Sequence, residues 1–115
     1  MKAFLLLFPT LAAATDLLLP LYQYPAGNGA AWQPIAQALA ANPALTAKIV
    51  INPSNGPGSG PGVGINDTQY VAGTQMLAAA SPGVELLGYV HTSTNGGQTR
   101  CNMDWETVKG MIQTW

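Results

Sequence analysis

Hydrophobic and polar residues follow one another along the chain in blocks that predict strands and helices in turn. The run Leu17–Tyr22 is almost continuously apolar, which is typical of a strand buried on both faces of a parallel sheet. Pro20 is the exception within it, because proline removes a donor from the strand ladder. Lys48–Asn52 is rich in β-branched residues and predicts a second strand, and Val84–His91 predicts a third.

A helical repeat of apolar positions follows the first predicted strand and its loop. Trp32, Ile35 and Leu39 lie at i, i+3 and i+7 and therefore share one helical face. Pro34 is tolerated only in a first turn, so the helix should begin close to it. The pair 42–43, Asn-Pro, should end this helix.

The second predicted helix comes after a loop, residues 53–64, that is dense in glycine and proline. Asn66 is its expected cap, with Gln69 three residues further on. Ile65 is placed to pack against Tyr70 as a hydrophobic staple. The expected apolar positions of this helix, and the residues that end it, are Met76, Leu77, Ala80 and then Ser81, Pro82 and Gly83.

The third predicted strand leads into a polar segment, Thr92–Asn102, that we expect to be a loop. Asp104 should then cap a third helix. The apolar face of that helix is expected to be Val108, Met111, Ile112 and Trp115, at i, i+3, i+4 and i+7. This pattern continues to the last residue without a glycine or proline stop signal.

Three strand–helix units spaced by about 30 residues predict an α/β fold with a parallel sheet and right-handed crossovers. A closed (β/α)₈ TIM-like barrel takes about 250 residues. We therefore expect residues 15–115 to be a partial barrel, its first three βα units. The alternative is a small, open α/β sandwich that is complete in itself. A partial sheet would expose apolar surface, so we also expect marginal folding.

The first residues have the pattern of a secretory signal peptide. Lys2 is followed by the apolar run Ala3–Leu11 and by the small residues Ala12–Ala14, which predicts a leader over residues 1–14. The run is shorter than the roughly 20 residues that span a bilayer. We therefore expect a secreted protein, extracellular or in the cell wall, with no membrane partner after cleavage.

Composition excludes several classes of partner. Charged residues make up 8% of the chain and hydrophobic residues 48%, which favours a packed core over disorder. Four basic residues without a cluster exclude nucleic acid as an expected partner. The loop from Gly56 to Gly64 has neither the spacing nor the lysine of a nucleotide-binding loop. One histidine, His91, and one cysteine, Cys101, are too few for a zinc site, so no metal or other cofactor is expected.

Three stretches at the predicted strand ends carry a family resemblance. Leu19–Pro25, Asn52–Pro61 and Gly88–Ser93, in this order and spacing, resemble the strand-end motifs of the spherulation-specific (spherulin 4-like) family. The resemblance implies a (β/α) barrel. It also implies a substrate class, because characterised relatives are fungal glycoside hydrolases that cut α-1,4-galactosaminidic linkages in galactosaminogalactan. Their catalytic acids follow the fourth and later strands, so it further implies that this chain lacks them.

The acidic residues have structural explanations on the predicted fold. Glycoside hydrolysis usually needs two carboxylates that face the scissile bond, and barrel active sites lie at the carboxyl ends of the strands. Asp16 and Glu85 are expected to precede their strands, at the opposite end. The other acids lie at helix starts, where a carboxylate complements the helix dipole: Asp67, Asp104 and Glu106. We therefore expect no catalytic residue, and no activity of the chain on its own.

Polar and aromatic residues gather at the predicted carboxyl ends and are the candidate sugar contacts. Tyrosine rings can stack on sugars, while amides and hydroxyls meet sugar hydroxyls. The candidates are Tyr22, Tyr24, Asn52, Asn55, Tyr89, His91 and Thr92. In the alternative interpretation the tyrosines are core residues and the asparagines satisfy loop amides. For His91 the alternatives are substrate contact and a structural hydrogen bond, since no acid lies near it in the sequence.

Asn66-Asp67-Thr68 is an acceptable N-glycosylation sequon, whereas Pro53 excludes Asn52 as an acceptor. A glycan on Asn66 would compete with its expected capping role. The lone Cys101 is buried, paired with another chain, or without its partner. The prediction is a truncated, inactive member of a secreted glycoside-hydrolase-like family. Two alternatives stay open: a secreted protein that binds polysaccharide without cutting it, and a structural cell-wall or spore-coat protein.

Overall fold

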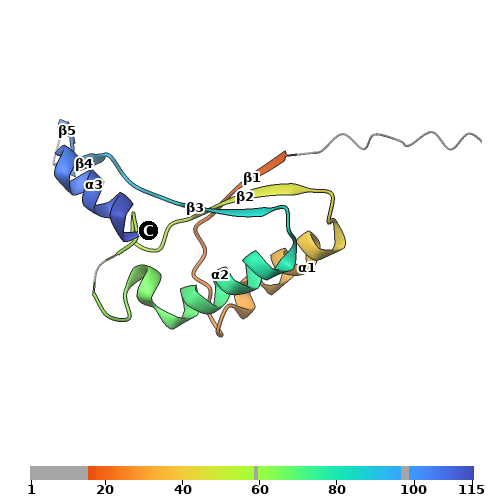
Figure 1. Ribbon diagram of the computed structural model, residues 1–115. Helices are drawn as coiled ribbons and strands as arrows, with labels where there is room; N and C mark the ends of the chain where they lie inside the picture. Colours follow the sequence, from red (N-terminus) through yellow and green to blue (C-terminus); the bar gives the residue numbers. More distant parts are fainter. Residues whose placement is uncertain (1–15, 59, 97–98) are drawn as a thin grey trace, which may run out of the picture.

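Strands and helices alternate through the first three strands, and two further strands precede the last helix (Figure 1). The computed structural model describes residues 16–58, 60–96 and 99–115, so the predicted leader, residues 1–14, lies outside the described residues. The elements in chain order are β1 (Asp16–Leu21), η1 (Ala30–Trp32), α1 (Gln33–Ala41), β2 (Thr46–Ile51), η2 (Gly64–Asn66), α2 (Thr68–Ala80), β3 (Val84–Gly88), β4 (Ser93–Gly96), β5 (Thr99–Asn102) and α3 (Trp105–Thr114).

The predicted parallel sheet is confirmed. Its strand order is β1-β2-β3, and every neighbouring pair is parallel. The register aligns Leu21, Ile51 and Gly88 at the carboxyl ends of the three strands. The helices α1 and α2 both cover the same face of this sheet (Figure 1), as right-handed crossovers that all turn the same way require.

The central strand β2 carries the core. Ala47, Ile49 and Ile51 alternate along it, are buried, and face the two helices. Trp32 and Leu77 are fully buried against them from the helix layer. The predicted apolar faces of the first two helices are therefore confirmed at their central residues, because the sheet shields these side chains from water.

The expectation that the first strand is buried on both faces is wrong. Among the described residues, β1 is an edge strand that pairs only with β2, and Leu18 is 62% exposed. The apolar run of β1 suits a strand that is buried on both faces. The described residues cover one of these two faces. Pro20 belongs to this edge strand, where a missing ladder donor is tolerated.

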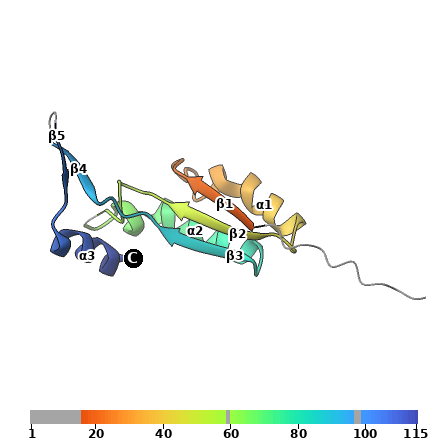
Figure 2. The ribbon, with the colours of Figure 1, turned by 90° about the horizontal axis from the view of Figure 1, so that it is seen from above.

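The face of the sheet turned away from α1 and α2, which we call the open face, carries the alternate residues of each strand. No described helix covers it (Figure 2). Lys48 and Glu85 are aligned in the register and lie 3.8 Å apart, Nζ to Oε2. Both side chains are more than half exposed, so the pair contributes little to stability.

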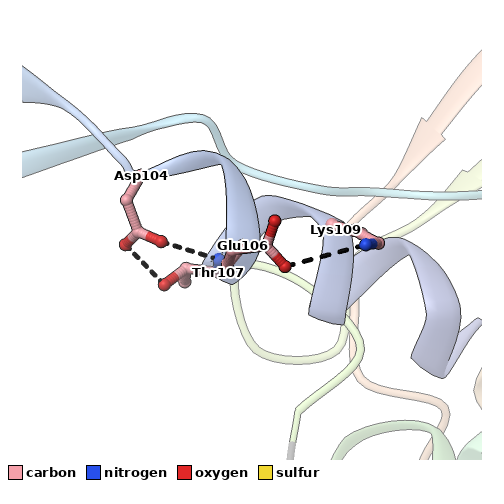
Figure 3. A network of polar contacts seen from close by, with 4 residues as sticks. All are labelled: Asp104, Glu106, Thr107 and Lys109. Carbon is pink, nitrogen blue, oxygen red and sulfur yellow. Dashed lines mark hydrogen bonds and ion pairs between the residues drawn. The ribbon is translucent and has the colours of Figure 1, made fainter.

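Two of the three predicted helix starts are confirmed and one is corrected. Pro34 lies in the first turn of α1. Asp104 caps α3 by accepting hydrogen bonds from the backbone N–H of Thr107 at 2.9 Å and from its hydroxyl at 2.6 Å (Figure 3). Both bonds lower the pKa of Asp104, and the bond from the Thr107 hydroxyl has the larger effect. The cap of α2, in contrast, is Asp67 and not Asn66, because a short 3-10 turn takes up Asn66.

Glu106 belongs to the same first turn of α3, and its Oε2 lies 3.7 Å from Nζ of Lys109 (Figure 3). The predicted apolar face of α3 is only partly buried: Val108 is buried, whereas Ile112 and Trp115 are exposed. Both views place α3 beyond the carboxyl ends of the sheet strands (Figures 1 and 2). In that position the sheet cannot cover the whole face.

The polar segment after the third strand is not the expected loop. The strand β3 ends at Gly88, before the expected His91, and the segments Ser93–Gly96 and Thr99–Asn102 form the antiparallel pair β4–β5. Hydrophobic periodicity did not predict this hairpin, because its strands pair with each other and are polar. The run Asn95-Gly96-Gly97 was the available signal, because clustered Asn and Gly residues indicate a turn, although Asn95 and Gly96 themselves pair with Arg100 and Thr99. Among the described residues, no helix is long and apolar enough to cross a bilayer.

The close approach of α2 to the layer beneath it yields a test of this packing. A Cβ added at Gly73 would lie 2.6 Å from Cε3 of Trp32 and 3.0 Å from Cβ of Pro25. Gly73→Ala should therefore destabilise the protein, because overpacking costs about 1–3 kcal/mol. The higher helix propensity of alanine offsets roughly 1 kcal/mol of this cost. The change is measured as a lower urea midpoint.

The matched control is Gln75→Ala, at an exposed position of the same helix. It should change the free energy of unfolding by no more than about 0.5 kcal/mol. A Gly73→Ala protein as stable as the control would contradict the described contact between α2 and Trp32.

Candidate functional site

The candidate site begins with a row of side chains at the carboxyl edge of the sheet. Tyr22, Asn52 and Tyr89 each come directly after the aligned strand ends. Strand alternation turns them to the open face, because the residues before Tyr22 and Asn52 are buried toward the helices. The backbone N–H of Tyr89 donates to the carbonyl of Ile51 at 2.9 Å, which continues the alignment past β3.

Two tyrosines of this row meet across the end of the central strand. The ring centroids of Tyr22 and Tyr89 lie 6.0 Å apart with the planes at 71°, an edge-to-face contact. They come from strands that are not neighbours, so the rings meet over the end of β2. Tyr22 is 55% exposed and Tyr89 is half-buried. The alternative that both are core residues fits Tyr89 better than Tyr22.

Asn52 and Asn55 shape the loop that follows β2. The side-chain oxygen of Asn52 accepts a hydrogen bond from the backbone N–H of Gly56 at 3.0 Å. This is the loop-amide role that was the alternative to sugar contact. Asn55 is exposed and has a positive φ of 51°, a conformation that asparagine adopts more readily than most residues.

The backbone carbonyl of Asn55 orients His91. Nδ1 of His91 donates a hydrogen bond to this carbonyl oxygen. The imidazole therefore has a structural partner although no acid lies near it in the sequence. With the proton on Nδ1, the neutral ring keeps an acceptor lone pair on Nε2. His91 is thus half-buried and fixed at the same edge of the sheet as the tyrosine pair.

Thr92 lies at the base of the β4–β5 hairpin. It is exposed, and its carbonyl accepts a hydrogen bond from the backbone N–H of Met103 at 2.9 Å.

The indole N–H of Trp115, from the end of α3, donates to the carbonyl of Tyr89 at 3.1 Å. A Cβ at Gly88 would lie within 2.6 Å of this indole, so the glycine makes the contact possible. Sequence patterns assigned Trp115 to a helical face and did not predict this contact.

Tyr24 does not join the row, although it was predicted with the others. Its hydroxyl donates to Oδ2 of Asp67 at 2.8 Å, and its ring meets that of Tyr70 at 5.5 Å in an edge-to-face contact. Asp67 also caps α2, where Oδ1 accepts from the backbone N–H of Gln69 at 2.8 Å. Tyr24 is therefore tied to the amino end of α2, on the helix side of the sheet.

The loop after β1 is locked to the same helix by a reciprocal amide pair that the sequence did not reveal. The backbone N–H of Asn28 donates to Oε1 of Gln69 at 2.6 Å, and Nε2 of Gln69 donates to Oδ1 of Asn28 at 2.9 Å. The indole N–H of Trp32 donates to the carbonyl of Gln23 at 3.0 Å. These bonds join residues up to 41 positions apart, and no local sequence motif predicts them.

A hollow of about 280 Å³ lies beside His91, between the loop after β2 and α3. A Cβ at Gly56 would point between Sδ of Met111, at 3.2 Å, and Nδ1 of His91, at 3.9 Å, so this glycine joins the hollow to the histidine. Its lining is Ser54, Gly56, Pro57, Gly58, Val63 and Met111. Its wall combines the glycine- and proline-rich loop after β2 with the apolar side chains of Val63 and Met111.

The five carboxylates of the chain lie apart from this edge or serve helix starts. Asp16 and Glu85 were expected to precede their strands. They lie within them instead, as the first residue of β1 and the second residue of β3. They still lie at the amino end of the sheet. Within residues 16–58, 60–96 and 99–115, no three His, Cys, Asp or Glu side chains are grouped so that they could hold a metal ion.

Comparison with known proteins adds sequence and structural relatives. The model of the spherulation-specific family 4 matches residues 16–115. Spherulin-4 of Physarum polycephalum is 45% identical over 78 residues, which are 67% of this chain and 20% of that protein. The crystal structure of Aspergillus clavatus Sph3 in complex with GalNAc superposes with a TM-score of 0.71 at 30% identity, over 90% of this chain and 36% of that one. The chain thus spans a minor part of each relative, and its fold is confirmed as part of a TIM-like α/β barrel.

The hydrogen bond from Tyr24 to Asp67 yields a pH-dependent test. The bond, helped by partial desolvation and the negative charge of Asp67, raises the pKa of Tyr24 above its ordinary value of 10.0. The stability that it contributes is therefore present below pH 10.0 and is lost as the pH rises through the raised pKa. Asp67→Asn should lower the Tyr24 pKa toward its ordinary value.

The measurement is the pH titration of tyrosine Cζ chemical shifts by NMR, with Tyr24→Phe to assign the signal. Tyr70 should follow in the same direction by a smaller amount, because burial is the first cause of its raised pKa and Asp67 the second. An unchanged Tyr24 midpoint in Asp67→Asn would contradict the described bond.

Proposed function

Since the chain belongs to the spherulation-specific family 4, we propose that it binds a galactosamine-containing polysaccharide at the carboxyl edge of its sheet. The protein is a spherulin 4-type chain with a glycoside-hydrolase-like fold. In this proposal it is secreted, and it meets the polymer outside the cell or in the cell wall.

The observation that carries the proposal is the pair Tyr22–Tyr89. A pyranose ring has an apolar face that packs on an aromatic side chain, while its hydroxyls need polar partners around the rim. Tyr22 presents an exposed ring at this edge, held edge-to-face by Tyr89. The Nε2 lone pair of His91 is a nearby acceptor for a sugar hydroxyl. The hollow beside His91, with Ser54 in its lining, offers further room for a sugar ring at this edge.

A relative supports the choice of sugar. Aspergillus clavatus Sph3 was crystallised with GalNAc, and 90% of this chain superposes on that protein at 30% identity. Galactosamine residues, acetylated or free, are therefore the first class of ligand to test for this chain.

We also propose that the 115-residue chain does not hydrolyse the polymer by itself. Asp67 and Asp104 accept backbone hydrogen bonds at helix starts, and Glu85 lies 3.8 Å from Lys48. A glycosidase needs two carboxylates on either side of one bond, and none of the five lies in the row with Tyr22 and Tyr89. In this proposal the chain contributes sugar contacts and does not contribute the acid or the nucleophile.

A structural wall or spore-coat role is the second candidate, and the open face of the sheet favours it. Leu18 is 62% exposed there, and the edges of β1 and β3 are unpaired among the described residues. Exposed edges and apolar surface promote association between chains. This role predicts insoluble assemblies, or cross-linking through Cys101, in place of sugar-specific retention.

Tyr22→Ala and Tyr89→Ala should each weaken retention on a partially N-acetylated α-1,4-linked galactosamine polymer. Loss of the stacking ring is expected to reduce affinity about tenfold, which corresponds to about 1.4 kcal/mol. The measurement is affinity electrophoresis or a pull-down with the polymer, with a glucose polymer as the specificity control.

Trp105→Ala is the matched control, because Trp105 is an exposed aromatic residue outside the row, on α3. Its retention should equal that of the wild type. Equal losses in all three variants, or retention on both polymers alike, would exclude the proposed site. Assembly that does not depend on added polymer would favour the structural role.

A further inference from the structure

We propose that Asn66 carries an N-linked glycan at the amino end of α2, on the same end of the sheet as the tyrosine row. The inference rests on the secretion included in the proposed function, because only chains that enter the secretory pathway meet the transferase. It does not depend on polysaccharide binding. The two can therefore fail independently.

The sequence contains one usable acceptor. Asn66-Asp67-Thr68 satisfies the sequon, while Asn52-Pro53-Ser54 is blocked by its proline. The two sites also differ in the folded protein. The Asn52 side chain is half-buried and holds the N–H of Gly56, whereas Asn66 is exposed.

The structure removes the conflict between glycan and helix cap that the sequence predicts. Asp67 caps α2, and Asn66 ends the 3-10 turn before it. The amide nitrogen of Asn66 donates one hydrogen bond, to the carbonyl of Gly60, at a long 3.3 Å. A glycosylated amide keeps one N–H, so this bond can persist. The start of α2 is therefore unaffected by the modification.

The other two sequon residues are also compatible with a glycan. The Asp67 carboxylate accepts hydrogen bonds from the Tyr24 hydroxyl and from the backbone N–H of Gln69, so both of its oxygens have partners other than Asn66. Thr68, the first residue of α2, is exposed. A glycan here would stand beside Val63, which is 47% exposed at the end of the glycine-rich loop. A hydrophilic sugar over this apolar side chain improves solubility.

The donor is by chemical class a lipid-linked diphosphate oligosaccharide. A bond forms between Nδ2 of Asn66 and the anomeric carbon of the first sugar. The bond between that carbon and the diphosphate oxygen breaks, and the lipid diphosphate leaves with the bonding electrons. The amide loses one proton to the transferase, and no oxidant or reductant takes part.

The test is secretion of the full chain from a eukaryotic host behind a heterologous leader, so that entry does not depend on residues 1–14. The expected result is a band that peptide N-glycosidase shifts to lower mass. Peptide mapping by tandem mass spectrometry should find aspartate at position 66 after the enzyme treatment. Asn66→Gln and Thr68→Ala should each abolish the shift.

Two variants separate the sequon from the helix start. Thr68→Ser keeps the hydroxyl and should keep the shift. Asp67→Asn also keeps the sequon, although it removes the carboxylate partner of Tyr24, and it should remain glycosylated. A secreted wild-type chain without a glycosidase-sensitive shift would overturn the inference. So would a shift that persists in Asn66→Gln.

Discussion

The burial of β2 is the constraint on which the rest of the structure depends. Its inward residues Ala47, Ile49 and Ile51 are covered by both helices, and both neighbouring strands take their register from it. Parallel pairing then places all three carboxyl ends at one edge. Each loop leaves the sheet at that edge because the chain must return over the helix face. The site is therefore a consequence of how the core strand is packed.

The two faces of this sheet have different environments, and the difference separates the candidate residues. On one face, α1 and α2 exclude water, and Gly73 lets the backbone of α2 approach the indole of Trp32. On the other face, Leu18 and the Lys48–Glu85 pair remain in contact with solvent. Alternation sends Tyr22 to the open face, where it meets Tyr89. The loop turns Tyr24, two residues further on, to the helix face, where Asp67 accepts a hydrogen bond from its hydroxyl.

Much of the candidate site could be predicted from the sequence, because strand ends are read from hydrophobic patterns and barrel sites lie at strand ends. Tyr22, Asn52 and Tyr89 were found in this way, and the register brings them together. The partners of the remaining candidates could not be found. The bond from His91 to the carbonyl of Asn55 spans 36 residues, and that from Tyr24 to Asp67 spans 43. Local patterns contain no information about such pairings.

The sequence by itself determined the order and type of the main elements, since apolar spacing and Pro, Gly and Asp stop and start signals act within one or two turns of chain. The tertiary structure alone decided which strand is an edge, which acid caps α2, and that the polar segment after β3 pairs as a hairpin. Each of these outcomes depends on groups distant in sequence that compete for the same hydrogen bonds or the same buried surface. Their free energies are set only when the chain has packed.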